Sequence, residues 1–248
     1  GEAGWVAEAA DVARFLLGEH RVDGRWRRAS IDGVAGAADA VAEDLGDLAE
    51  GLVALHRATG DRAWLDEARD VLDVALRDYA VDADRPGEGG FYDVPPVPAD
   101  GVALLLRPRS LVDLAEPCGT SALAGALLGA AAALDEVAVG EVAMGEGAVA
   151  VAASDEGAGS AATSGEPAGC DGAASGKHAG RNGAASGEAG DPDRSAQAAR
   201  FRAAGEAALR LLAGASLAQP RFAGWALATA EAEALRRRRE LEGPTATS

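Results

Sequence analysis

Lysine, cysteine and methionine are nearly missing from this chain of 248 residues. Lys177 is the single lysine, so arginine supplies almost all of the basic side chains, and the formal net charge is -17. A surface this acidic repels phosphate backbones and anionic lipid headgroups, which disfavours nucleic-acid and membrane-surface partners. Two explanations of the acidity stay open: hydration at high salt and, more simply, GC-rich codon usage that replaces lysine by arginine.

The two cysteines, Cys118 and Cys170, lie far apart and form neither a CxxC motif nor a zinc-ligand spacing. This predicts no metal site and no cofactor, and it favours a reducing, cytoplasmic compartment. No signal peptide opens the chain. Because Gly1 is not an initiator methionine, we expect the chain to be a processed product or a fragment.

Helical periodicity dominates what is present. Apolar residues recur at helical spacing in six segments, 5–19, 38–59, 62–80, 121–135, from about 195 onward, and after Pro220. Thr59-Gly60-Asp61 ends one helix and caps the next, which predicts an antiparallel hairpin. The run at 121–134 is too short and too rich in Gly and Ala for a membrane span, and it predicts a buried helix that neighbours approach closely.

The fold class predicted is therefore all-α. Only VDGRWRRASIDG, around the turn pair Asp23-Gly24, indicates short extended arms, and no sheet core is predicted. We expect helical hairpins over 1–136 with a site-bearing loop at 82–120, a closing hairpin at 195–241 and a tail at 242–248. The Ala/Gly/Ser-rich segment 137–194 cannot bury enough apolar area to offset chain entropy, so it is predicted to be a low-complexity, mostly disordered insertion, with a weak helix near Val137 to Met144 as an open alternative.

The segment from Pro86 to Leu128 has no helical pattern until its end, although helical sequence lies on both sides. Glycines at 87, 89 and 90 and prolines at 95, 96, 98, 108 and 117 break regular structure. A connection this long between helices is typical of a functional loop. It holds a high density of polar and aromatic groups: Phe91, Tyr92, Asp93, Arg107, Asp113 and Ser121.

Several pieces of the chain together resemble the C-terminal part of the thioredoxin-domain-containing family that includes the mammalian spermatogenesis-associated protein and bacterial YyaL-like proteins. The pieces are AEDLGDLAEGLVALHRATGD (42–61), WLDEARDVLDVALRDY (64–79), GGFYD (89–93), LLLRPRSLVDLAEPCGTSALAGALL (104–128) and LAQPRFAGWALATAEAEAL (217–235). The resemblance implies a six-hairpin (α/α)6 toroid, of which this chain holds about three hairpins. The family's thioredoxin-like domain and the first half of the toroid would be the missing partners, and Gly46 is unusual for a helix.

In such a toroid, polar groups from the inner helices and one rim converge on the ligand. This implies a carbohydrate-related role, a sugar-like small molecule as ligand, and little or no turnover by this chain alone. Asp44 and Asp113 are the predicted catalytic carboxylates, since acids on opposite walls can act as general acid and base. The predicted substrate-binding residues are Tyr92, Arg107 and Ser121. Glu43 and Asp44 point about 100° apart on a helix, so only Asp44 was assigned to the lumen.

Structural interpretations of the same residues stay open. Asp44 caps a loop or pairs with Arg107 in this alternative, Arg107 forms a structural salt bridge, Ser121 caps the fourth helix, and Cys118 is a small buried residue. The competing functional class is a noncatalytic protein-interaction module or a helical scaffold. Fold analogy alone does not decide whether the chain is an enzyme.

Overall fold

The computed structural model describes residues 2–81, 89–97, 104–152 and 192–242. Helices account for most of these residues, which confirms the all-α fold class. The helices are α1 (Glu2–Glu19), α2 (Ala42–Thr59), α3 (Arg62–Asp78), α4 (Gly119–Ala152), α5 (Pro192–Ala218) and α6 (Gly224–Glu242), with a 3-10 turn, η1, at Pro220–Phe222.

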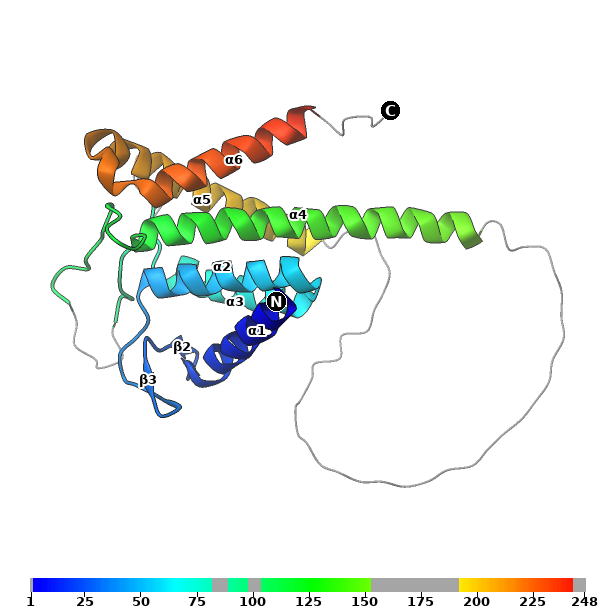
Figure 1. Cartoon of the computed structure of the whole chain (residues 1–248). Helices are drawn as coiled ribbons and strands as arrows, with labels where there is room; N and C mark the ends of the chain where they lie inside the picture. The colour runs from blue at the N-terminus through cyan, green and yellow to red at the C-terminus, as the bar shows by residue number, and fades with distance from the viewer. Residues whose placement is uncertain (1, 82–88, 98–103, 153–191, 243–248) are drawn as a thin grey trace, which may run out of the picture.

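Helix α4 lies at the centre of the fold. It contacts α2, α3, α5 and α6, whereas α1 packs on α2 at the edge of the assembly (Figure 1). Every buried residue of the first four turns of α4 is Ala, Leu, Gly, Ser or Thr, and few of its side chains there reach solvent. The prediction that this small-residue helix is among the most buried is confirmed.

The predicted hairpin of α2 and α3 is present, and its junction has the expected geometry. Gly60 adopts a left-handed conformation with φ 71°, and its N–H donates to the His56 carbonyl. The Asp61 carboxylate accepts a hydrogen bond from the Ala63 N–H at 3.0 Å and so caps α3. A glycine stop followed by an aspartate cap therefore reverses the chain within two residues.

The segment between α1 and α2 forms two small antiparallel hairpins, so the fold holds short strands in addition to its helices. Asp23-Gly24 and Asp32-Gly33 turn the chain with positive φ at both residues (51° and 74°, 52° and 76°), as type I′ turns require. The strands are β1 (Arg21–Val22) with β2 (Arg25–Trp26) and β3 (Ser30–Ile31) with β4 (Val34–Ala35). Trp26 is 5% exposed, and it packs in the core.

The predicted boundaries of the insertion are wrong at both ends. Residues 137–152 continue α4 as regular helix, which extends past the weak helix considered near 137–144, and α5 begins at Pro192 rather than near 195. The physical reason is local: Ala is the strongest helix former, and a helix already nucleated by buried turns propagates at little cost. The rest of the insertion, 153–191, lies outside the described residues, as do 82–88, 98–103 and the end of the tail at 243–248.

The apolar part of α4 is longer than the predicted run. By length and composition alone, Gly119–Gly140 could cross a membrane, but more than half of its most apolar stretch is buried against other helices. The core helix of a globular fold has the same character.

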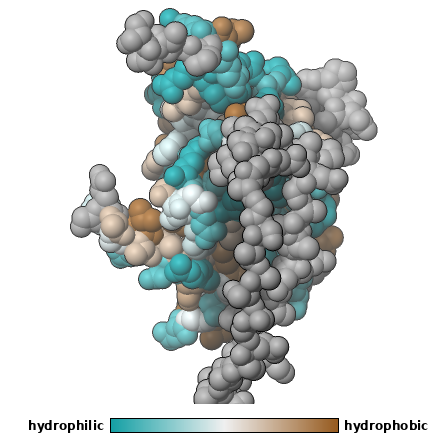
Figure 2. Space-filling model, turned by 90° about the vertical axis from the view of Figure 1, so that its right-hand side faces the viewer, coloured by the Kyte–Doolittle hydropathy of each residue, from teal (hydrophilic) through white to brown (hydrophobic). Residues whose placement is uncertain are grey.

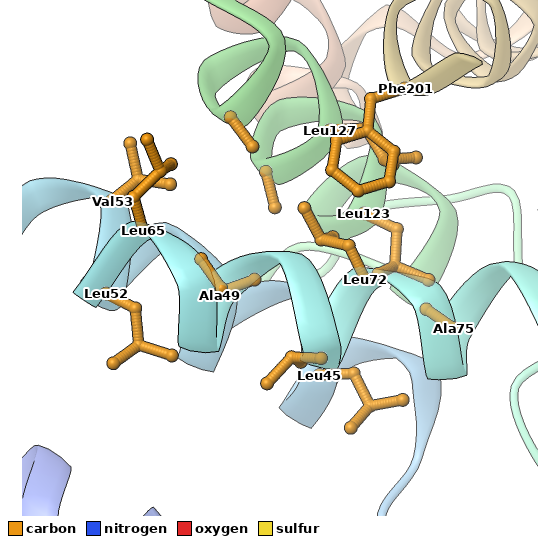
Figure 3. Close-up of a cluster of buried hydrophobic side chains, with 14 of the residues drawn as sticks. Leu45, Ala49, Leu52, Val53, Leu65, Leu72, Ala75, Leu123, Leu127 and Phe201 are labelled. Carbon is orange, nitrogen blue, oxygen red and sulfur yellow. The ribbon is translucent and has the colours of Figure 1, made fainter. Parts of the chain in front are cut away.

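The core forms where α2, α3, α4 and α5 meet. In Figure 3 the Phe201 ring of α5 reaches toward Leu127 of α4 and Leu72 of α3, and all three side chains are fully buried. Burying each such side chain contributes roughly 1.5–3 kcal/mol to folding. On the face in Figure 2, by contrast, hydrophobic and hydrophilic residues are interspersed, so the apolar side chains there do not form one continuous patch.

Two glycines let α2 and α4 approach closely. A Cβ added at Gly46 would lie 2.6 Å from the Cβ of Ala122 and 2.8 Å from the backbone nitrogen of Leu123. A Cβ at Gly119 would lie 2.6 Å from the Cβ of Ala42. Gly46 is unusual within a helix, and its contact with α4 explains it, because no larger residue fits there.

Candidate functional site

The connection between α3 and α4 folds over the ends of the helices through backbone hydrogen bonds. The Val81 N–H donates to the Gly90 carbonyl at 3.0 Å, and the Tyr92 N–H donates to the Tyr79 carbonyl at 2.9 Å. The backbone carbonyl of Asp93 accepts from the Ala42 N–H at 2.9 Å. Gly90 has φ 85°, and a Cβ there would lie 2.9 Å from the Leu211 side chain. The GGFYD stretch is thus a structural link between the start of α2 and the end of α3.

Arg107 and Tyr92, two of the predicted substrate-binding residues, lie in contact with each other. The guanidinium lies over the Tyr92 ring, 4.0 Å from its centroid. It also donates to the Val94 carbonyl (3.0 Å from Nε) and to the Asp78 carbonyl (2.7 Å from a terminal nitrogen), so its donors are used by the backbone. Burial lowers the pKa of Arg107. The expected salt bridge of Arg107 is replaced by these bonds to carbonyl groups.

Asp113 is buried and joins three segments of the chain. One carboxylate oxygen accepts from the Cys118 N–H at 3.0 Å, and the other accepts from the N–H groups of Trp225 (3.0 Å) and Ala226 (3.3 Å). These donors lie at the starts of α4 and α6, where helix N–H groups have no partner within their own helix. Asp113 therefore fixes the position of α6 relative to α4.

Ser121 lies within the first turn of α4 and is 2% exposed. Its Oγ lies 3.4 Å from Cys118 Sγ. The alternative that Ser121 caps α4 is wrong, because the helix already begins at Gly119. Cys118 is buried as expected, and burial raises the pKa of its thiol.

Asp44 lies in the first turn of α2. Its carboxylate accepts from the Val41 N–H at 2.9 Å, which satisfies one of the free donors at the helix start. Asp44 pairs with Arg28 rather than with Arg107: the Nε of Arg28 lies 3.6 Å from the Oδ2 of Asp44. The five predicted site residues are thus not brought into one cavity: Asp44 lines a groove beside α1, whereas the others line neither that groove nor the pocket described next.

A pocket of about 540 Å³ lies between the start of α2 and the loop that leads into α4. We call it the carboxylate pocket because Glu43, Asp93 and Glu116 line it. Arg28, Ser110 and Cys118 complete its polar lining. Asp93 is held in place by the Ser110 N–H, which donates to its carboxylate at 3.0 Å.

The electrostatics of this pocket centre on Glu43. Burial, a hydrogen bond with the Glu116 carboxyl, and the negative charges of Asp47, Glu116 and Asp44 raise the pKa of Glu43 to about 7. A carboxyl group beside other negative charge ionises less easily, so Glu43 keeps its proton to a higher pH than a free glutamate. A carboxylic acid that keeps its proton near pH 7 can donate a hydrogen bond or a proton to a ligand.

Sequence reasoning missed this pair for two reasons. Neighbouring residues on a helix cannot both face one lumen, and the prediction chose Asp44. The pocket, however, lies on the Glu43 side of α2. Glu116 stands just before Pro117 in irregular chain, where no periodicity shows which way a side chain points. An acidic residue immediately ahead of a helix start was the available signal.

No family model matches the chain, and neither a curated protein nor a solved structure matches it. The resemblance to the thioredoxin-domain-containing family therefore stays a prediction. Within the described residues, no three His, Cys, Asp or Glu side chains are grouped so that they could hold a metal ion.

Proposed function

We propose that the carboxylate pocket binds a small, hydroxyl-rich, sugar-like molecule, with Glu43 as the hydrogen-bond and proton donor. The observation that carries the proposal is the pKa of Glu43, raised to about 7 beside Glu116 in a pocket of about 540 Å³. That volume is within the range of small-molecule sites, roughly 300–1,000 Å³. Ser110 and Arg28 add polar groups that suit hydroxyl oxygens.

The contact between the two carboxyl groups favours one kind of chemistry. Glycoside hydrolysis uses carboxylates about 5 Å or more apart, so that sugar or water fits between them. Glu43 and Glu116 share a hydrogen bond instead. The pair therefore fits binding or proton transfer on a sugar-like ligand better than cleavage of a glycosidic bond.

An (α/α)6 toroid is the architecture proposed to hold this site. Its support is the contact of α4 with α2 on one side and α6 on the other, as successive inner helices of a toroid require. The outer helices α3 and α5 are also joined, because Arg200 of α5 lies 2.7 Å from Asp73 of α3. Membership of the thioredoxin-domain-containing family is part of the same proposal.

The proposal is tested by ligand-observed NMR with glucose, mannose and N-acetylglucosamine. Binding should weaken as the pH rises through 7, because Glu43 loses its proton. Glu43→Gln should retain binding at pH 8, since an amide still donates a hydrogen bond, whereas Glu43→Ala should lose it. Glu50→Gln, an exposed carboxyl on the same helix, is the control.

Absence of binding by all three sugars, or binding that neither Glu43 variant changes, would overturn the proposal. The competing function is a noncatalytic interaction module. It is favoured by the engagement of Arg107 and Asp113 with backbone groups, which leaves them structural. Alanine at Arg107 that lowers stability without changing sugar binding would support that structural role.

A further inference from the structure

A second cavity, separate from the carboxylate pocket, lies between α1 and α2. It is an open groove of about 690 Å³. Its floor and walls are the apolar stripe of each helix: Ala9, Val12, Ala13 and Leu16 from α1, and Leu45, Leu48, Gly51, Leu52 and Leu55 from α2. We call it the α1–α2 groove.

The dimensions of the α1–α2 groove match a helix. The lining of α1 runs from Trp5 to Leu16 and that of α2 from Asp44 to Leu55, so each wall is about 16 Å long at a rise of about 1.5 Å per residue. Two neighbouring helices with small residues between their ridges form the groove into which a third helix packs. Trp5 is 78% exposed and Val12 54% exposed, so apolar surface at the mouth is uncovered.

The charged residues that line the groove leave a net negative charge. Arg27 is paired with Asp39 at 3.0 Å, and Arg28 lies 3.6 Å from Asp44. Glu8 on the α1 wall and Asp47 on the α2 wall line the groove, and neither has a cation partner within the described residues. A ligand that brings positive charge to both walls would therefore be favoured.

We propose that the α1–α2 groove is a docking site for an amphipathic helix of a partner protein that carries an apolar stripe flanked by basic residues. The apolar stripe would cover Trp5, Val12 and Leu48, and the basic flanks would face Glu8 and Asp47. This is helix-in-groove recognition, in which apolar anchors recur at i, i+3, i+4 and i+7. Arg28 lines both this groove and the carboxylate pocket, but the apolar walls of the groove belong to the groove alone.

The probe is a synthetic 18-residue peptide with leucines at that spacing and lysines elsewhere, labelled with fluorescein. Its charge-reversed twin carries glutamates in place of the lysines. Fluorescence anisotropy with the full chain should show saturable binding of the lysine peptide and none of the twin. Asp47→Asn should weaken binding by about two- to threefold at low salt, as expected for one exposed charge pair.

Two variants block the groove without relying on charge attraction. Val12→Asp adds negative charge, which would strengthen any nonspecific attraction of a basic peptide, yet it should weaken binding at least about tenfold because a carboxylate is costly to bury. Leu227→Asp on α6 is the matched control, since Leu227 is 52% exposed and lies outside the groove. It should bind like the unchanged chain.

Gly51→Leu is the second blocking variant. Gly51 lines the groove and a Cβ there meets nothing within 4 Å, so a side chain at this position has room to start into the groove. Circular dichroism confirms that each variant folds. Equal binding by Val12→Asp, Gly51→Leu and Leu227→Asp would overturn the proposal, as would equal binding of the two peptides. Sedimentation showing a dimer that Val12→Asp dissociates would assign the groove to a second copy and also overturn it.

Discussion

Helix α2 has two flanks that are packed in opposite ways. On the side of α4, Gly46 is needed because any Cβ would lie 2.6 Å from Ala122. On the side of α1, a Cβ at Gly51 would meet nothing within 4 Å, and a groove of about 690 Å³ remains. Close packing thus requires glycine at position 46, whereas at position 51 of the same helix a Cβ has free space.

This difference in packing indicates where substitutions should change the stability and where a ligand can bind. Close packing against α4 continues to the start of that helix, where Gly119 fits beside Ala42 and the carboxylate pocket begins. Loose packing against α1 buries only Ala10 and Ala13 of that helix. Substitutions should therefore be costly where α2 touches α4, whereas the exposed Gly51 on the α1 side should accept a side chain.

The largest effect is expected for Gly46→Leu. The side chain would collide with the backbone of α4 rather than with a flexible group, so α2 and α4 must separate and the core around Leu123 must loosen. We expect a loss of about 3 kcal/mol or more in the free energy of unfolding, at the upper end of overpacking effects. Urea unfolding followed by circular dichroism measures it. A loss below about 1 kcal/mol would contradict the close approach.

Asp113→Ala should rank second. It leaves the N–H groups of Cys118, Trp225 and Ala226 without their acceptor, and each buried unsatisfied group is costly. We expect a loss of about 2–3 kcal/mol and faster hydrogen exchange at the starts of α4 and α6. Asp113→Asn, which keeps one acceptor oxygen, should lose less. Equal stability of the alanine variant and the unchanged chain would show that Asp113 is free to serve a ligand instead.

Glu43→Gln separates the pocket's electrostatics from its packing. Because the pKa of Glu43 is raised from 4.5 to about 7, the folded state binds more protons than the unfolded state between those values. The stabilisation is full below pH 4.5 and is lost as the pH rises through 7. Relative to the unchanged chain, Glu43→Gln should be equally stable at pH 4.5 and more stable at pH 8, by about 1 kcal/mol or less because solvent screens the site.

Thermal melts of both proteins from pH 4.5 to 8 measure this difference. The same melts on Glu50→Gln report the effect of removing one exposed acidic charge from α2. A stability difference for Glu43→Gln that is constant with pH would show that folding does not raise the pKa of Glu43.

How far the sequence predicted the fold depends on the range of the interactions. The α2–α3 hairpin was predictable because Gly60 and Asp61 act on their own neighbours, and helical periodicity marked both helices. The helix over 137–152 was predictable only in part, near 137–144, because the composition of the whole segment argues against order although alanine favours helix locally. Gly46 was noticed as unusual, but its reason lies on α4, which no local pattern reveals.

The candidate site was less predictable still. Polar residues of the loop were expected to face a ligand, yet Arg107 and Asp113 satisfy backbone groups that a long irregular connection leaves unpaired. Glu43 and Glu116 are distant in sequence, and their contact depends on how the loop crosses the start of α2. Such pairings come from tertiary packing, which periodicity does not encode.

The smallest effect expected is on the open flank. Gly51→Ala should stabilise the chain by about 0.5–1 kcal/mol, because alanine loses less backbone entropy than glycine in a helix and the added methyl meets free space. Gly46→Ala is the matched control: the same change in the same helix should destabilise. Urea unfolding of the two variants measures both signs. If Gly51→Ala also destabilises, α1 must lie closer to α2 than the groove requires, and a third helix could not enter between them.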